Sequence, residues 1–205
     1  MNNLAEVASR VSVCTDCILS KQRTLAVPGE GAGNASVMFI GEGPGFHEDR
    51  QGRPFVGPAG KFLSELLDSV GMKREDVFIT NVVKCRPPGN RDPLPGEIQA
   101  CKKYLDKQLE LIKPKVVVTL GRHSMGRYMP GQTITKVHGK PKRVDDVMVY
   151  PLYHPAAALH NVSLKSVIEE DFKAVPGLLK EAAKETAKPA AKTEEQSSKQ
   201  LNLFS

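Results

Sequence analysis

Four cysteines are the residues of this chain whose type and spacing most clearly predict chemistry. Cys14 and Cys17 are separated by two residues, which is a chelating spacing, and Cys85 and Cys101 follow much later. Four thiolates gathered from distant segments can bind a zinc ion or an iron–sulfur cluster. Spacing alone does not decide between the two, but either group would tie the N-terminus to the middle of the chain.

Two other uses of these cysteines fit the sequence less well. A CxxC pair in a thioredoxin-like redox site normally follows a strand and opens a helix, and residues 12–17 do not have that pattern. Structural disulfides would need an oxidising compartment, yet residues 1–10 contain no apolar segment of the signal-peptide type. We therefore expect a cytoplasmic protein with a four-cysteine metal site.

The overall composition bounds the fold and the partners. The chain has 205 residues, of which 40% are hydrophobic, and this is enough for one core. No apolar run approaches the length of a membrane span, so no membrane association is expected. The net charge of +6 permits a polyanionic partner without requiring one.

The composition changes sharply near Lys180. Residues 181–199 are mostly Ala, Lys, Glu, Ser and Thr, which predicts a short helical extension and then a flexible linker. Residues 200–205 read QLNLFS, and large apolar residues after a solvated linker are hard to explain by folding. The predicted organisation is a domain at 1–180, a linker at 181–199 and a docking peptide at 200–205.

Apolar runs alternate with helical patterns through the predicted domain. The predicted strands are residues 37–40, 77–83, 116–121 and 147–152. The predicted helices are residues 58–70, 96–112, 122–128 and 164–179, the last interrupted near Pro176 and Gly177. This alternation predicts a parallel sheet that is covered on both faces. The expected fold is a three-layer α/β/α sandwich with a central four-stranded parallel sheet.

Polar groups sit at the carboxyl ends of all four predicted strands, at the sheet edge where such folds collect functional residues. They are the loop Gly41 to Gly45, then Asn81, residues 121–124 and His154. The loop lacks the Lys and Ser/Thr of a P-loop and contains a proline, so nucleotide binding is not expected. It instead places Glu42 between two glycines, where backbone can approach a ligand closely.

Three motifs occur in order along the chain. The first joins residues 41–45 (GEGPG) to 52–60 (GRPFVGPAG), the second is 80–93 (TNVVKCRPPGNRDP), and the third is 154–159 (HPAAAL). Together they resemble the family 4 uracil-DNA glycosylases over about residues 10–180. The resemblance implies that the four cysteines hold a [4Fe–4S] cluster. The sequence departs from the family at Gly43, where Ala is commoner.

The resemblance implies how a flipped-out uracil would be held. Phe55, which from its Gly/Pro-rich surroundings could be core or a stacking platform, would stack on the base. Asn81 would pair with O4 and N3–H, which cytosine presents in reverse. Backbone N–H groups of Gly41, Glu42 and Gly43 would also hold the base, and Glu48 would exclude the 5-methyl group of thymine.

It also implies the groups that break the bond. Glu42 would orient water and favour the positive charge that develops on the sugar. His154 would donate a hydrogen bond to uracil O2 as negative charge grows there. The cluster takes no necessary part in hydrolysis, so it would be structural or would position DNA. His123 and His138 have no such support and are interpreted as structural or surface residues.

Contacts to DNA are predicted around the pocket. Residues 154–161 would form a loop that enters the DNA, with Leu159 as an apolar wedge. Three basic residues near the second motif are expected to contact phosphates, or else to form a solvated basic face: Lys84, Arg86 and Arg91. The covalently DNA-bonding branch of the superfamily carries a Lys/Arg-rich insertion after the second motif. That insertion is absent here, which implies a turnover enzyme.

The end of the chain resembles the Gln-Leu-x-Leu-Phe peptide with which bacterial repair proteins bind the sliding clamp. The matching residues are Gln200, Leu201, Leu203 and Phe204. The archaeal and eukaryotic clamp peptide usually ends in two adjacent aromatic residues, so the bacterial clamp and a nucleoid-associated location are implied. Docking there would raise the local enzyme concentration at replication sites.

These observations predict a monomeric, monofunctional uracil-DNA glycosylase that acts on single- or double-stranded DNA and leaves an abasic site. One alternative is a non-catalytic iron–sulfur DNA-binding module, against which the intact Glu42, Asn81 and His154 argue. The other is a zinc-stabilised hydrolase of a different nucleotide substrate.

Overall fold

Six strands form one sheet in the computed structural model, which describes residues 1–186. In sheet order they are β1 (Glu30–Gly31), β3 (Phe78–Asn81), β2 (Val37–Gly41), β4 (Val116–Leu120), β6 (Val147–Leu152) and β5 (Lys142–Val144). The inner four strands are parallel, and β1 and β5 pair antiparallel at the two edges. The four predicted strands are therefore confirmed as the parallel core. The edge strands were not predicted, because two or three residues are too few to show a pattern.

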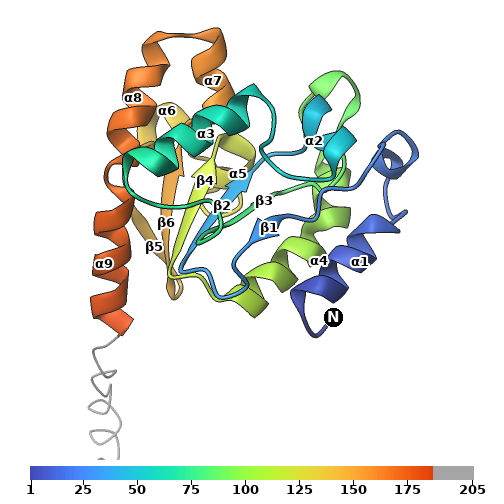
Figure 1. Cartoon of the computed structure of the whole chain (residues 1–205), viewed down its shortest axis with the longest axis horizontal. Coiled ribbons are helices and arrows are strands. Elements are labelled where there is room, and N and C mark those ends of the chain that lie inside the picture. Colours follow the sequence, from blue (N-terminus) through green and yellow to red (C-terminus); the bar gives the residue numbers. More distant parts are fainter. Residues whose placement is uncertain (187–205) are drawn as a thin grey trace, which may run out of the picture.

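Helices cover both faces of the sheet (Figure 1). The longer ones are α1 (Leu4–Ser12), α3 (Pro58–Ser69), α4 (Pro95–Ile112), α8 (Ser163–Phe172) and α9 (Val175–Thr186). The shorter ones are η1 (Ile18–Lys21), α2 (Phe46–Gln51), η2 (Pro88–Asn90), α5 (Arg122–Gly126), α6 (Ile134–Val137) and α7 (Pro155–His160). None of the helices within residues 1–186 is both long and apolar enough to cross a membrane.

The two faces of the sheet have separate hydrophobic cores. Val37 and Phe39 of β2 pack into a cluster with α3, α8 and α9, whereas Met38 and Ile40 pack into a cluster with α1 and α4. Successive strand residues point to opposite faces, so a continuous apolar strand supplies both layers. This confirms the predicted three-layer α/β/α sandwich.

Three predictions about the C-terminal half need correction. The predicted interruption of the helix at 164–179 is present, but it lies at Lys173 and Ala174, just before the predicted Pro176 and Gly177. Proline is tolerated in the first turn of a helix because its missing N–H has no partner there. The segment predicted as a loop at 154–161 contains the helix α7 (Pro155–His160), which His154 and Asn161 cap. Helix α9 continues past residue 180 and buries Ala182, so the folded domain extends beyond its predicted end. The predicted docking peptide lies outside the described residues.

Candidate active site and cysteine site

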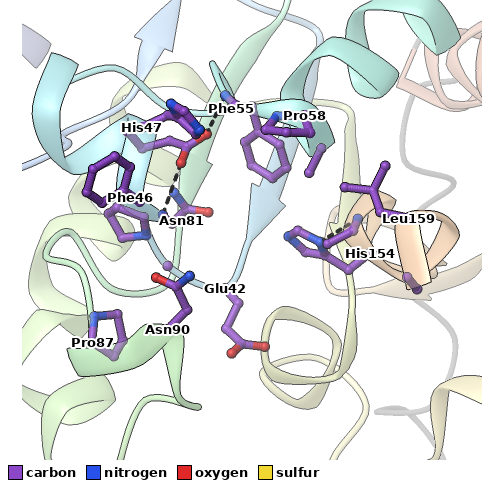
Figure 2. A pocket seen from close by; sticks show the side chains of 18 of the residues that line it. Glu42, Phe46, His47, Phe55, Pro58, Asn81, Pro87, Asn90, His154 and Leu159 are labelled. Carbon is purple, nitrogen blue, oxygen red and sulfur yellow. Dashed lines mark hydrogen bonds between the residues drawn. The ribbon is translucent and has the colours of Figure 1, made fainter.

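A pocket of about 540 Å³ opens at the carboxyl edge of the parallel strands (Figure 2). Glu42 follows β2, Asn81 ends the adjacent strand β3, and His154 follows β6, which is separated from β2 by β4, so the carboxyl ends of three strands bring these side chains into one cavity. Phe55 and Leu159 also line it. The fold therefore assembles the polar groups that the sequence placed after separate strands.

Asn81 has a buried side chain whose Oδ1 lacks a hydrogen-bond partner within the described residues. A buried amide oxygen without a partner is costly, and in a pocket it is available to a ligand. Gly41 does not line the pocket, but a Cβ there would lie 2.4 Å from Asn81 Oδ1 and 2.6 Å from Phe55 Cζ. A glycine at position 41 is thus what lets the amide and the aromatic ring approach each other.

Phe55 is held in a strained loop. Its φ of 51° is in the left-handed region, and a Cβ on Gly60 would lie 1.9 Å from the Phe55 carbonyl oxygen. The ring is buried and stacks on His154, with centroids 5.5 Å apart and planes 26° apart. Such a fixed ring is a rigid wall for a planar base.

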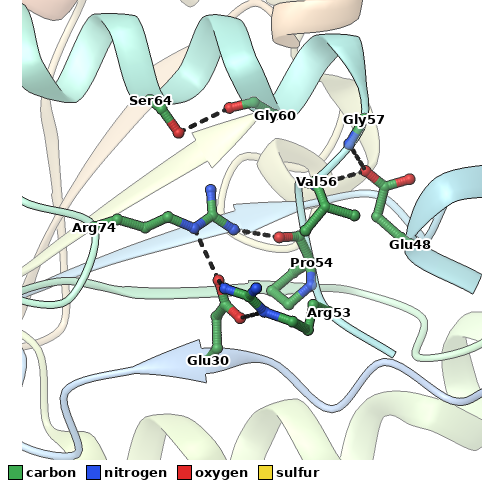
Figure 3. Close-up of polar contacts among 9 residues, drawn as sticks. All are labelled: Glu30, Glu48, Arg53, Pro54, Val56, Gly57, Gly60, Ser64 and Arg74. Carbon is green, nitrogen blue, oxygen red and sulfur yellow. Dashed lines mark hydrogen bonds and ion pairs between the residues drawn. The ribbon is translucent and has the colours of Figure 1, made fainter. Parts of the chain in front are cut away.

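Glu48 fastens this loop to the pocket (Figure 3). Its Oε1 accepts hydrogen bonds from the backbone N–H groups of Val56 and Gly57, both at 2.9 Å, and its Oε2 accepts one from Gly45 at 3.1 Å. On the other side of the loop, Arg74 donates to Glu30 and to the carbonyl of Pro54. The Glu48 carboxylate lines the pocket, and its hydrogen bonds fix the backbone of the loop that carries Phe55.

His154 is a neutral hydrogen-bond donor. Burial lowers the pKa of His154 to about 4. Its Nδ1 accepts a hydrogen bond from the Ala156 N–H at 3.1 Å. In the neutral imidazole the proton is therefore on Nε2.

Glu42 lies in an acidic and basic cluster that the sequence did not predict. Its Oε2 is 3.7 Å from His123 Nε2, and the same nitrogen is 3.6 Å from Asp92 Oδ1. Burial raises the pKa of Glu42, with Asp92 acting in the same direction and His123 and Arg122 against it. The ligand atoms of Glu42, Asp92 and His123 lie within 4.8 Å of one another, as in cation sites. Arg122, however, already forms an ion pair with Asp92. The position of His123 just after β4 was the available sequence signal for its place beside Glu42.

The predicted phosphate contacts divide into three cases. The prediction for Lys84 is wrong, because its side chain is only 1% exposed and its Nζ donates hydrogen bonds to groups in the interior. Burial lowers the pKa of Lys84 to about 7. Arg91 lines the pocket, but both of its terminal nitrogens donate to the Glu97 carboxylate in a bidentate ion pair. Arg86 is half-buried, donates to Asn90 and packs on the ring of Phe46.

The cysteine site is a small cavity of about 10 Å³, lined by all four cysteines, of which Cys85 and Cys101 are buried and Cys14 and Cys17 are half-buried. Arg23 donates to Cys85 Sγ at 3.0 Å, and the Lys84 backbone N–H donates to Cys101 Sγ at 3.2 Å. Such bonds favour thiolates and tune cluster ligands. Without a metal, burial raises the pKa of Cys85 and raises that of Cys101 to about 11.

The spacing of the sulfurs bears on which metal group would fit. No three of these sulfurs lie within 4.8 Å of one another among the described residues. Four zinc–sulfur bonds of about 2.3 Å in a tetrahedron would hold sulfurs about 3.8 Å apart. The N–H donors directed at two of the sulfurs would stabilise thiolate ligands of either a zinc ion or an iron–sulfur cluster.

Fold and site together define an enzyme that hydrolyses N-glycosyl bonds. Residues 28–174 match the family described as the Uracil DNA glycosylase superfamily, and the chain belongs to that superfamily. It is 50% identical over 187 residues to the type-4 uracil-DNA glycosylase of Sulfurisphaera tokodaii, which covers 85% of this chain and 84% of that protein. Two other proteins of the same description are 45% identical: that of Archaeoglobus fulgidus over 184 residues (85% and 92% covered) and that of Thermotoga maritima over 179 (85% and 93%). The predicted resemblance is thus confirmed at the level of the family.

Proposed function

We propose that this protein is a monofunctional uracil-DNA glycosylase, which hydrolyses the bond between uracil and deoxyribose in DNA, leaves an abasic site and so starts base excision repair. The observation that supports this most directly is the pocket itself. It holds a carboxylate, a neutral imidazole and an amide oxygen without a partner in the described part of the chain, all at the carboxyl edge of the parallel strands. Its volume of about 540 Å³ is ample for one flipped-out base.

Uracil would be recognised by the groups on the pocket wall. Asn81 Oδ1 accepts from uracil N3–H, and the amide nitrogen donates to O4. Cytosine lacks the N3–H and carries a donor in place of O4, so both groups would be left unpaired. The ring of Phe55, which lines the pocket, would cover one face of the base.

Hydrolysis would then use Glu42 and His154. The Glu42 carboxylate orients a water molecule toward C1′ and accepts its proton as the new C1′–O bond forms. The C1′–N1 bond breaks with its electron pair going to uracil, and His154 Nε2–H donates to uracil O2 to stabilise that anion. A neutral donor of this kind commonly contributes about 3–4 kcal/mol in the transition state.

The four cysteines would hold a [4Fe–4S] cluster. Cys14 and Cys17 lie between α1 and η1, Cys85 follows β3, and Cys101 is on α4. The cluster would fix these segments to one another, and no bond-breaking step requires it.

The DNA strand would pass over the lip of the pocket. Phe46 is 46% exposed there, and the guanidinium carbons of Arg50 and Arg86 lie 5.4 and 5.2 Å from its ring centroid. Guanidinium groups stacked on an aromatic ring keep their N–H edges free for phosphate oxygens. Leu159 is 51% exposed on α7 and remains the proposed wedge. Recruitment by a bacterial sliding clamp through residues 200–205 and a monomeric state also remain proposals.

The decisive experiment measures free base and abasic sites after incubation with a uracil-containing oligonucleotide and a matched thymine oligonucleotide. We expect uracil release and no thymine release. If a cluster-loaded protein binds both oligonucleotides and releases neither base, the non-catalytic DNA-binding module is the correct reading.

A further inference from the structure

Lys84 lies in the interior between the cysteine site and the pocket. The three hydrogens of its ammonium group match three acceptors: Thr80 Oγ1 at 2.5 Å, Gln108 Oε1 at 2.7 Å and the backbone oxygen of Asn81 at 2.9 Å. None of these acceptors is a carboxylate. Burying a cation is costly, and an apolar side chain of similar size is often as stable or more so. Stability alone therefore does not explain a lysine at this position.

The acceptor with functional meaning is the carbonyl of Asn81. The Asn81 side chain must present its amide to the base, yet its Oδ1 has no hydrogen bond that would fix it. The backbone on one side of the residue is fixed by the pairing of β3 with β2, where Gly41 is its partner. On the other side, Lys84 Nζ holds the carbonyl of the strand's last residue. The direction of the amide therefore depends on both.

Lys84 is also tied to the cysteine site. Its backbone N–H donates to Cys101 Sγ at 3.2 Å, and the next residue is Cys85. Gln108, which holds the ammonium, is on the same helix as Cys101. The residues that form the cysteine site thus also fix the position of the lysine.

We propose that Lys84 is a positioning residue for base recognition, which transmits the geometry of the cysteine site to the amide of Asn81. This inference rests on the proposed function, because it assigns Asn81 as the group that reads uracil. It predicts that removing the ammonium weakens recognition of uracil while leaving general DNA binding unchanged.

The first test is Lys84→Met, which keeps a long unbranched side chain but removes the three donors. Binding is measured by fluorescence anisotropy with an oligonucleotide that carries 2′-fluoro-2′-deoxyuridine, whose fluorine disfavours the sugar cation and so slows cleavage. The same oligonucleotide with thymidine is the reference. We expect about tenfold weaker binding of the uridine oligonucleotide, with thymidine binding and the visible absorbance of the cluster unchanged.

A double-variant cycle separates positioning from a merely structural role. If Lys84 acts through Asn81, adding Lys84→Met to Asn81→Ala causes no further loss of uridine binding. If the two losses multiply, Lys84 does not act through Asn81 and the inference is overturned.

A second variant decides the matter if Lys84→Met does not fold. Thr80→Val removes one acceptor of the ammonium from a fully buried strand position. Thr119→Val is the matched control on β4, where the hydroxyl has no hydrogen-bond partner among residues 1–186. We expect only Thr80→Val to lower the uridine preference. Equal uridine preference in wild type and Thr80→Val would refute the role of Lys84, whereas a wild type without any uridine preference would instead refute the proposed function.

Discussion

The base pocket and the cysteine site are built from the same stretch of chain but have opposite physical characters. Residues 81–86 run from the pocket, at Asn81, to the cysteine site, at Cys85. The pocket is open, about 540 Å³, and contains an unpartnered polar atom. The cysteine site is much smaller, about 10 Å³, and two of its sulfurs accept hydrogen bonds from the protein.

The difference between the two sites follows from what each must do. A site that must take in a ligand keeps donors and acceptors unpaired and holds them rigid, as Glu48 does for the Phe55 loop. A site that joins segments fills its space and satisfies its groups. The comparison predicts that changes in the pocket affect rate, whereas changes in the cysteine site affect stability.

The largest effect should come from Glu42→Gln. We expect the rate of uracil release to fall about 10³-fold, because glutamine keeps the size of the side chain but cannot accept the proton from water. Single-turnover assays give the rate, and anisotropy gives the affinity for DNA. Affinity that fell in step with the rate would assign Glu42 to base binding instead of hydrolysis.

Cys101→Ser should have its main effect on stability. Loss of one ligand of the proposed cluster is expected to cost about 3 kcal/mol, which lowers Tm by about 6–12 °C in a chain of this size. Visible absorbance and thermal unfolding check this. Ala100→Ser, which lines the same cavity without being a ligand, is the matched control and should retain both properties. A Cys101→Ser protein with the absorbance and Tm of wild type would remove the distinction between the two sites.

The acid limit of activity should be set by Glu42. The pKa of Glu42 is raised by burial, whereas that of His154 is lowered to about 4, so on acidification the glutamate is protonated first. Because Asp92 raises the pKa of Glu42, Asp92→Asn should move the acid limb of the pH–rate profile to lower pH. His123→Ala should move it the other way, since His123 lowers that pKa. An unmoved acid limb in both variants would show that another group controls it.

The smallest effect should come from Arg86→Gln. Loss of one phosphate contact is expected to reduce the slope of log affinity against log salt by about 0.7 on single-stranded DNA, equally for uridine and thymidine oligonucleotides. Lys73→Gln, before β3 and so near the opposite edge of the sheet, should leave the slope unchanged. A loss confined to uridine would place Arg86 in base recognition.

The sequence by itself determined the layers of the fold and the main residues of the pocket. Continuous apolar runs such as residues 116–120 predict buried parallel strands, and groups that follow such strands must meet at one edge. Glu42, Asn81 and His154 could therefore be brought together without coordinates. Local patterns also carried the resemblance to the family, since each of its motifs is a short continuous segment.

Only the tertiary structure decided which charged groups are buried and which meet across loops. Lys84 follows an apolar run and precedes a cysteine, and lysine is rarely fully buried, so the sequence favoured an exposed phosphate contact. Its burial depends on α4, which supplies Gln108, and on Pro28. The carbonyl oxygen of Pro28 accepts hydrogen bonds from Gln108 and Thr80, the two side chains that hold the Lys84 ammonium. The meeting of Glu42 with Asp92 and His123 likewise depends on how two loops and the helix α5 are packed together. Burial and long-range pairing are properties of the packed chain, and no local pattern encodes them.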